Sequence, residues 1–234
     1  MALIFGSKTT RANAGVGNTT TVGQYTVHTF TSGTNFTPTS SGMIDILAVG
    51  SGGPAHPGGQ PSLGSGGGGA GAVIYRKFVP VVAATPYTIT IGTNGSATSF
   101  GSLVTAPGGG AGGYEGVAGT PAPGASGGGG GRGPTAGGTG AGVLGIGFPG
   151  GTGGSTNGAG GGGAGGVGNN ASGPALGGPG TPITYFTGVS PNIVSVGGNG
   201  QGITPTSSTY GSGATAPSPS YVPGVQGALY IRYI

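Results

Sequence analysis

Apolar residues occur in a few short stretches of the chain, where most of them alternate with polar residues at every second position. The clearest stretch is PYTITIG, residues 86–92, which predicts a strand with Tyr87, Ile89 and Ile91 facing a core. The run MIDILAVG, residues 43–50, predicts a strand buried on both faces except at Asp45. Further strands are expected over residues 24–30, 72–79, 98–106 and 227–234, with the 72–79 strand ending at Pro80.

Glycine and proline dominate the composition. The 234 residues include 65 Gly and 19 Pro, together more than a third of the chain, and these are the two residue types least compatible with an α-helix. No stretch has apolar residues at the i, i+3, i+4 and i+7 spacing of an amphipathic helix. We therefore expect an all-β protein with essentially no α-helix.

Residues 107–225 contain long glycine runs, and these runs have nothing that could form an apolar core. One interpretation is a flexible linker, the usual behaviour of sequence rich in Gly and Ser. A collagen-like triple helix requires Gly at every third residue, and the run at residues 128–131 breaks that register. The third interpretation is a bundle of packed polyglycine II helices, whose backbone N–H and C=O groups bond between neighbours because no Cβ atoms separate them.

Interruptions of the glycine runs favour the packed bundle. Bulky clusters such as VLGIGFPG and TPITYFTGVSPN recur between the runs, and a flexible linker has no use for them. A rod of about twelve residues would be about 37 Å long, the size of a small domain. We expect an N-terminal docking segment over residues 1–23, a small β-sandwich over 24–106, an inserted polyglycine II bundle over 107–225 and a closing strand over 226–234.

Charge is sparse along the chain. Six cations and two acids give a net charge of +4. Only Arg76 and Lys77 are adjacent, so nucleic-acid binding, which needs clustered cations, is not expected. The N-terminal apolar run, residues 2–5, is too short for a secretory signal or a membrane span. We expect synthesis in a cytoplasm, no membrane insertion and, without Cys, no dependence on redox state.

Two patterns raise the question of an enzyme. Residues 50–55, GSGGPA, fit the G-x-G-x-x-G/A pattern of dinucleotide sites, but the Pro-rich sequence after them predicts no helix to hold a pyrophosphate. His28 and Asp45 are expected on adjacent strands, as a surface cross-strand pair rather than part of a Ser-His-Asp site. No cluster has metal-ligand spacing. We expect no enzyme activity, no catalytic or metal-ligating residues and no cofactor.

Several segments carry a family resemblance. VHTFTSGTNFTPTSSGMIDILAVGSGG, residues 27–53, is similar to the opening of glycine-rich domains in bacteriophage tail fibres and related virion proteins. GSGGGGAGAVIYRKFVPV, residues 64–81, resembles the glycine tract and Val-Pro strand of that family. PYTITIGTNGSATSFGSLVTAPGGGAGG, residues 86–113, resembles the segment that leads to its next glycine tract.

The resemblance implies a small β-sandwich from which polyglycine II helices project, with loops at their distal ends that contact a host. The function it implies is that of a virion structural protein exposed on the particle surface, as a tail-fibre tip or receptor-binding component. The implied partners are other virion proteins, further copies of the chain (a trimer is compatible) and a host surface glycan or outer-membrane protein. A capsid- or tail-decorating subunit without a receptor and an extracellular filament or matrix protein stay open as alternatives.

Aromatic residues inside the glycine region are the candidates for receptor contact, because rigid aromatics on a scaffold of small residues suit recognition surfaces. The alternative is that they cap the rods or pack on the sheet. The apolar start of the chain is a candidate for docking in an assembly, or for a strand added to the chain's own sheet. The receptor-contact candidates are Tyr114, Glu115, Phe148, Tyr185 and Phe186, and the assembly-docking candidates are Leu3, Ile4 and Phe5.

Overall fold

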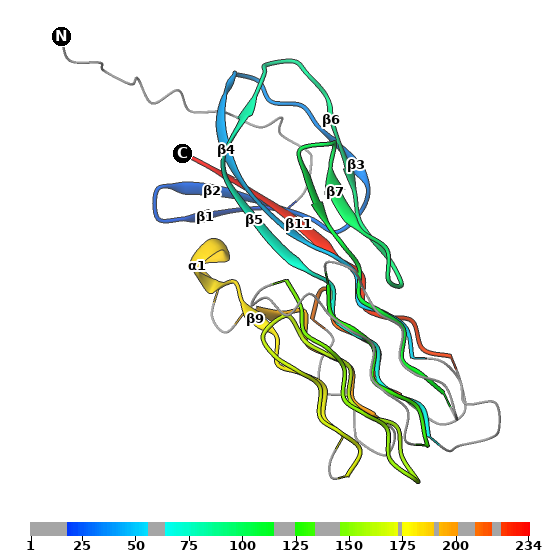
Figure 1. The fold of residues 1–234 in the computed structure, drawn as a ribbon. Coiled ribbons are helices and arrows are strands. Elements are labelled where there is room, and N and C mark those ends of the chain that lie inside the picture. Colours follow the sequence, from blue (N-terminus) through cyan, green and yellow to red (C-terminus); the bar gives the residue numbers. More distant parts are fainter. Residues whose placement is uncertain are drawn as a thin grey trace.

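The protein is elongated, with a β-sandwich at one end and a bundle of glycine-rich segments at the other (Figure 1). The computed structural model describes residues 18–55, 64–114, 125–133, 146–172, 175–189, 192–200, 209–216 and 221–234. Within these ranges nearly all regular structure is antiparallel β, and the helical part is one turn, α1 (Thr184–Thr187). The expected all-β class is confirmed. No helix in the described ranges is long and apolar enough to cross a membrane.

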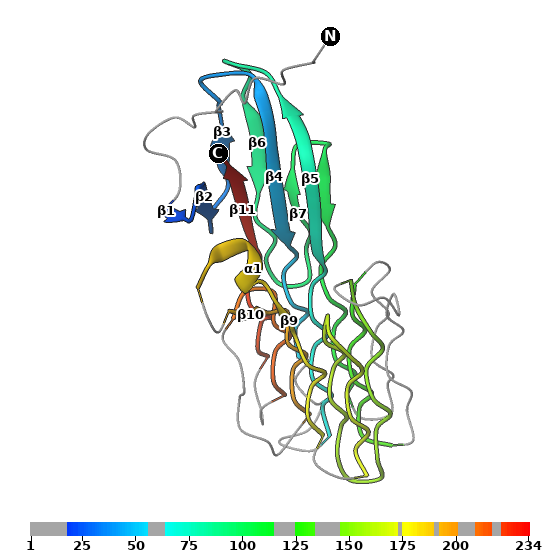
Figure 2. The ribbon, with the colours of Figure 1, turned by 90° about the vertical axis from the view of Figure 1, so that its left-hand side faces the viewer.

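Two sheets pack face to face to form the sandwich. Figure 2 looks onto the five-stranded sheet, with the four-stranded sheet behind it and α1 across its lower part. A separate two-stranded pair lies beside α1 and consists of β9 (Thr181–Pro182) and β10 (Ile193–Val194). The larger sheet has the order β1 (Asn18–Val22), β2 (Tyr25–Phe30), β11 (Ala228–Tyr233), β4 (Gly42–Val49) and β5 (Val73–Val81), and the smaller has the order β3 (Thr34–Phe36), β6 (Tyr87–Thr90), β7 (Thr98–Phe100) and β8 (Val104–Ala106).

Strand β4 is buried on both faces from Ile46 to Val49, as its apolar run predicts, whereas Met43 near its start is exposed, contrary to that expectation. Ile44 and Ile46 point between the sheets, where they join a core with Phe100 of the smaller sheet. On the opposite face, Leu47 packs in a second core with Phe186 of α1. This second core attaches the helical turn to the outer face of the five-stranded sheet.

The strand ends differ from the sequence expectation in two places. β5 continues through Pro80 to Val81. Because β5 lies at the edge of its sheet, the missing N–H of proline removes no ladder bond. Residues 18–22, expected to be part of the N-terminal docking segment, pair with β2 as β1, and residues 1–17 lie outside the described ranges.

The glycine segments are joined by hydrogen bonds between segments. The N–H groups of the segment at residues 64–72 bond three neighbouring segments in rotation and return to the same neighbour at every third residue. This period is the three-residue turn of the polyproline II geometry, so the segments are polyglycine II rods. Gly66 donates to Gly113, Gly67 to Ala159, Gly68 to Ala214, and Gly69 returns to the first neighbour at Gly110.

The rod at residues 64–72 is surrounded on all sides. Its carbonyl groups accept from three further rods, so it has six hydrogen-bonded neighbours. Gly67 accepts from Gly129, Gly68 from Gly198 and Gly69 from Gly53. Every peptide group from 67 to 69 is therefore paired on both its donor and its acceptor side, which removes the penalty for burying backbone without side chains.

Glycine is required in this rod because there is no space for a Cβ atom. A Cβ on Gly67 would lie 2.0 Å from the carbonyl oxygen of Gly198, and one on Gly68 would lie 2.0 Å from that of Gly53. Real Cβ contacts are never this short, so even alanine would push neighbouring backbones apart. The rods at 50–55 and 64–72 belong to the same bundle as those within 107–225.

Candidate functional site

The bundle has one end at the sandwich and one end far from it, which we call the distal end. The rod at residues 107–114 leaves β8 and ends at Tyr114, and the rod at 125–133 runs beside it, with Arg132 hydrogen-bonded to Gly64. Gly133 bonds Gly154 at the same level. The distal end is therefore held by backbone bonds between rods up to their last described residues.

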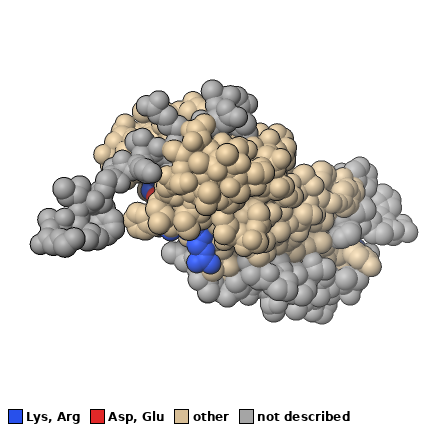
Figure 3. All heavy atoms as spheres, turned by 90° about the horizontal axis from the view of Figure 1, so that it is seen from above, with Lys and Arg blue, Asp and Glu red and all other residues tan. Residues whose placement is uncertain are grey.

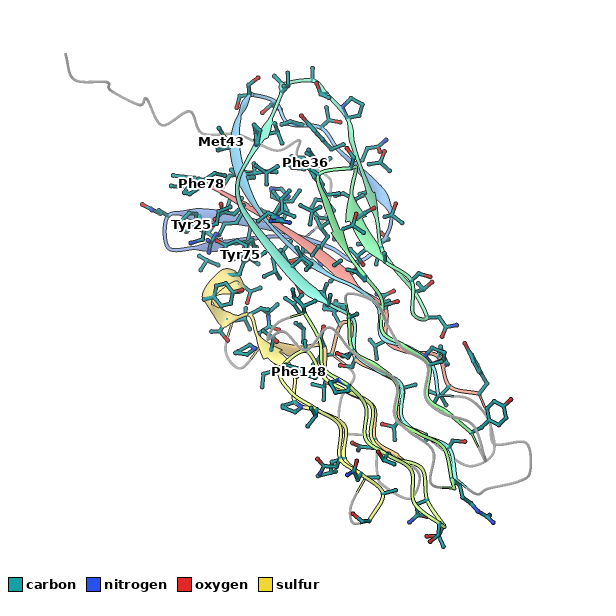
Figure 4. The ribbon with its side chains drawn as sticks, viewed as in Figure 1. Tyr25, Phe36, Met43, Tyr75, Phe78 and Phe148 are labelled. Atoms are coloured by element: carbon teal, nitrogen blue, oxygen red, sulfur yellow. The ribbon has the colours of Figure 1, made fainter. Side chains whose placement is uncertain are left out.

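The structure does not gather the predicted receptor-contact residues into one site. Tyr114 lies at the distal end with 42% of its surface exposed. Phe148 lies at the sandwich end of the bundle and is half-buried (Figure 4). Tyr185 and Phe186 lie on α1, against the five-stranded sheet. Glu115 and the docking candidates Leu3, Ile4 and Phe5 lie outside the described residues.

Phe186 packs on the sheet, which is the alternative that the sequence left open for these aromatics. It is completely buried, and its ring lies edge-on to Tyr75 at 5.5 Å and to Tyr230 at 6.4 Å. Tyr185 next to it is 57% exposed, and its ring lies 5.9 Å from Tyr75. The helical turn thus places one aromatic in the core and presents the other to solvent.

An open groove of about 570 Å³ runs along the flank of the bundle to the distal end. Two rods form it, at residues 149–151 and 167–172, and its polar side chains are Asn169, Asn170 and Ser172. Asn170 accepts a hydrogen bond from the backbone N–H of Thr152 through its Oδ1 atom at 2.7 Å, which fixes its side chain. This groove was not predicted, although the Asn pair in GVGNNASG is the visible signal that side chains project from the rod there.

The charged side chains of the described residues lie mainly at the sandwich, and the groove carries none. Figure 3, a view from above, shows few charged side chains among the described residues of that face. The described charges are those of Arg76, Lys77, Arg132, Arg232 and Asp45. The amides, hydroxyl and peptide groups of this groove, which lie among the apolar side chains of Pro149 and Val167, can donate to and accept from neutral hydroxylated ligands without desolvating an ion.

Asp45 is the centre of a polar network on the outer face of the five-stranded sheet. Arg232 lies directly opposite it on β11, and the Nη2 atom donates to Oδ2 of Asp45 at 2.8 Å. Tyr75 donates to the same oxygen at 2.9 Å, and the N–H of Phe78 donates to Oδ1 at 3.1 Å. Arg232 also donates to the carbonyl oxygen of Tyr185 at 3.1 Å, so the network ties α1 to the sheet.

Aromatic rings surround the guanidinium group of Arg232. Its central carbon lies 4.5 Å from the ring centroids of Tyr25 and Phe186, distances at which a cation is attracted to the ring face.

Partial burial raises the pKa of Asp45, but hydrogen bonds from Arg232, Phe78 and Tyr75 outweigh this and hold the pKa below its ordinary value. Burial and the bond to Asp45 raise the pKa of Tyr75 to about 12. The ion pair of Asp45 and Arg232 is therefore charged at neutral pH.

His28 and Asp45 do not face one another, contrary to the expected cross-strand pair. β11 lies between β2 and β4. The His28 side chain is buried on the inner face, where its Nε2 atom lies 2.8 Å from the hydroxyl oxygen of Tyr233, whereas Asp45 faces outward to Arg232. The two side chains therefore take part in separate structural contacts on opposite faces of the sheet.

The glycines of GSGGPA face neighbouring rods. A Cβ on Gly50 would lie 2.0 Å from the carbonyl oxygen of Pro107, and one on Gly52 would lie 1.9 Å from that of Ser212. The N–H of Gly53 bonds Gly69. The glycine pattern that resembles a dinucleotide motif is thus required by rod packing.

Comparison with known proteins agrees with this architecture. The glycine-rich domain family matches residues 28–234, which cover the sandwich from β2 onward and the whole bundle. No curated protein shows significant similarity to the chain. Because the match extends over most of the sequence, the chain belongs to the glycine-rich domain family.

Proposed function

We propose that the chain is a virion structural protein that contacts a host surface, as a tail-fibre tip or receptor-binding component. The observation that carries this proposal is the rigid distal end. Hydrogen bonds between rods hold Tyr114 at the end of the bundle opposite the sandwich, and the groove lies along the flank of two further rods. Figure 1 shows the bundle projecting away from the sandwich. A surface that is ordered before binding loses little conformational entropy when it meets its ligand.

The chemistry of the groove favours a host glycan as the ligand. Asn169 and Ser172 are exposed, and the groove bears no charge. Amide and hydroxyl groups match the hydroxyl groups of sugars, which both donate and accept hydrogen bonds. Exposed Tyr114, on a different rod at the distal end, supplies an aromatic surface of the kind common in recognition sites.

Copy number and adsorption test this function in the particle whose genome encodes the chain. We expect a few copies per fibre end, and we expect the purified chain to adsorb to the host cells and to reduce infection. The chain's absence from the particle, or a failure to adsorb to the host, would contradict the proposal. Hundreds of evenly spaced copies without adsorption would instead identify a capsid- or tail-decorating subunit.

A pair of variants tests whether the groove carries the contact. Asn169→Arg places a long cation in the groove, and Thr105→Arg places the same cation on an exposed position of β8 in the sandwich. We expect Asn169→Arg to reduce adsorption at least tenfold and Thr105→Arg to leave it unchanged. Equal adsorption by both variants would exclude the groove as the contact surface.

A further inference from the structure

The outer face of the five-stranded sheet exposes a set of large apolar side chains, far from the distal end. We call Met43, Phe78, Tyr185 and Ile234 the sandwich patch. Their exposed fractions are 57%, 72%, 57% and 48%. Figure 4 shows Met43 and Phe78 on the same side of the sandwich as Tyr25 and Tyr75.

The Asp45 network organises this patch. Met43 and Asp45 lie on the same face of β4. The register that pairs Arg232 with Asp45 places Ile234, which follows β11, at the level of Met43. The backbone N–H of Phe78 donates a hydrogen bond to Asp45, and Arg232 donates one to the carbonyl oxygen of Tyr185. Phe78 and Tyr185 are therefore both tied through their backbones to the Asp45–Arg232 pair.

Phe78 is exposed at the expense of stability. Its φ angle is +55°, in the left-handed region that bulky residues rarely occupy. It sits at the bulge where the register of β4 and β5 shifts between Ile44 and Ile46. A glycine or asparagine would fit this backbone better, and the Phe ring gains little burial in return. The bulge with Phe thus destabilises the fold while presenting a large ring to solvent, as a binding residue does.

Charge argues for a partner other than a second copy. Lys77 is exposed beside the patch, with its Nζ atom 5.5 Å from the centroid of the Tyr75 ring, and the one acid among the described residues, Asp45, is already paired with Arg232. A second copy would bring another Lys77 against it. Edge-to-edge pairing of β5 is also disfavoured, because Pro80 and the bulge interrupt its outer edge.

We propose that the sandwich patch binds a different virion protein through a segment with apolar side chains flanked by carboxylates, with Phe78 as the central contact. This inference rests on the proposed function, and it assigns the sandwich as the end that joins the particle while the distal end stays free. Apolar contacts would supply affinity, and Lys77 would orient the acidic segment.

Site-specific cross-linking tests the partner. Phe78 is replaced by the photoreactive analogue benzoyl-phenylalanine, and Leu103, an exposed residue of the other sheet, is replaced in a control. Irradiation of assembled particles is expected to cross-link position 78 to an apolar segment with Asp or Glu in another virion protein, and Lys77→Glu is expected to reduce the yield at least fivefold. Cross-links between copies of this chain, no yield above the Leu103 control, or no effect of Lys77→Glu would overturn the inference.

A second variant separates binding from folding. Phe78→Asn removes the ring and relieves the backbone, so we expect a higher melting temperature together with at least fivefold fewer copies per particle. A full copy number of Phe78→Asn would overturn the inference. If the unsubstituted chain is absent from particles, the proposed function is overturned instead. The cross-linking experiment at position 78 is then carried out in the cells that synthesise the chain and is judged by the same criteria.

Discussion

The Nη2 atom of Arg232 lies 2.8 Å from Oδ2 of Asp45, and these two residues are 187 positions apart in the chain. The contact joins strand β11 to strand β4. The residues that lie between these two strands in the sequence form most of the bundle. The sandwich is therefore closed by a strand that is made only after the described bundle segments that precede it in the sequence. The ion pair, with its aromatic surroundings, fixes that closure.

Asp45→Asn is expected to lower the free energy of unfolding by about 2 kcal/mol, between the values typical of exposed and of buried ion pairs. Asp45 and Arg232 are mostly buried, so the variant leaves the guanidinium partly desolvated without its counter-ion. Urea unfolding followed by circular dichroism measures the change. Arg76→Gln, which removes an exposed charge from the same sheet, is the control and is expected to change stability little. An equal loss in both variants would contradict the role of the pair.

The same carboxylate predicts a dependence on acid. The pKa of Asp45 in the folded protein lies below its ordinary value of 3.8, so folding favours the ionised form. Its contribution to stability is complete above pH 3.8 and is lost as the pH falls through the folded pKa. Melting temperatures of the unsubstituted protein should therefore decline in this range more steeply than those of Asp45→Asn. Parallel declines would show that other groups control the acid response.

Gly68→Ala is expected to destabilise the protein by about 3 kcal/mol or more, or to prevent folding, because it overpacks the centre of the bundle. The added methyl would lie 2.0 Å from the carbonyl oxygen of Gly53, which cannot move without breaking other bonds between rods. In Gly33→Ala the nearest atom, the carbonyl oxygen of Ile89, is 3.4 Å away, so this control should stay close to the unsubstituted protein. Thermal unfolding of both variants gives the comparison, and equal melting temperatures would exclude tight packing of the rods.

Hydrogen exchange tests whether the bundle is a folded unit. The amides of Gly67, Gly68 and Gly69 each donate to a neighbouring rod, so they should exchange only through large-scale opening of the bundle. Their rates, measured by NMR or mass spectrometry, should be far slower than those of the exposed edge strand β1. Exchange as fast as in an unfolded peptide would mean that the glycine segments behave as a linker.

Phe78→Asn is expected to stabilise the protein by about 0.5–1 kcal/mol, because Asn tolerates the left-handed backbone better than Phe. Chemical denaturation measures the difference. Leu103→Asn is the matched control, since Leu103 is also an exposed apolar residue but does not have a positive φ angle. A loss of stability in Phe78→Asn would show that the ring contributes to the fold.

Much of the sandwich could be predicted from the sequence because alternation of apolar and polar residues marks a half-buried strand. Tyr87, Ile89 and Ile91 face the core as their spacing predicts. The formation of polyglycine II rods was also predictable, because glycine has no side chain and glycine segments can associate only through backbone hydrogen bonds. The order of the strands was not predictable. No local signal shows that β11 inserts between β2 and β4, and for this reason the pairing of His28 with Asp45 was wrong.

The positions of the receptor-contact candidates in the fold could not be predicted for a related reason. Glycine runs are nearly identical to one another, so the sequence does not specify which rods are neighbours or which end of a rod is distal. Phe186 and Tyr185 are adjacent in a glycine-rich region, yet one is buried and the other exposed, because a single helical turn directs them apart. The exposure of Phe78 depends on a bulge that the alternation of β5 does not reveal.

The absence of space inside the bundle also limits how the chain can evolve. A rod with six bonded neighbours accepts almost no substitution at its centre, so inherited variation must accumulate where rods end and on the outer flank. At Asn169 the bonds to neighbouring rods are made by the backbone, so its exposed side chain can change while those bonds persist. The chemistry of the outer flank can therefore change through a few replacements, while the same rigid support persists unchanged.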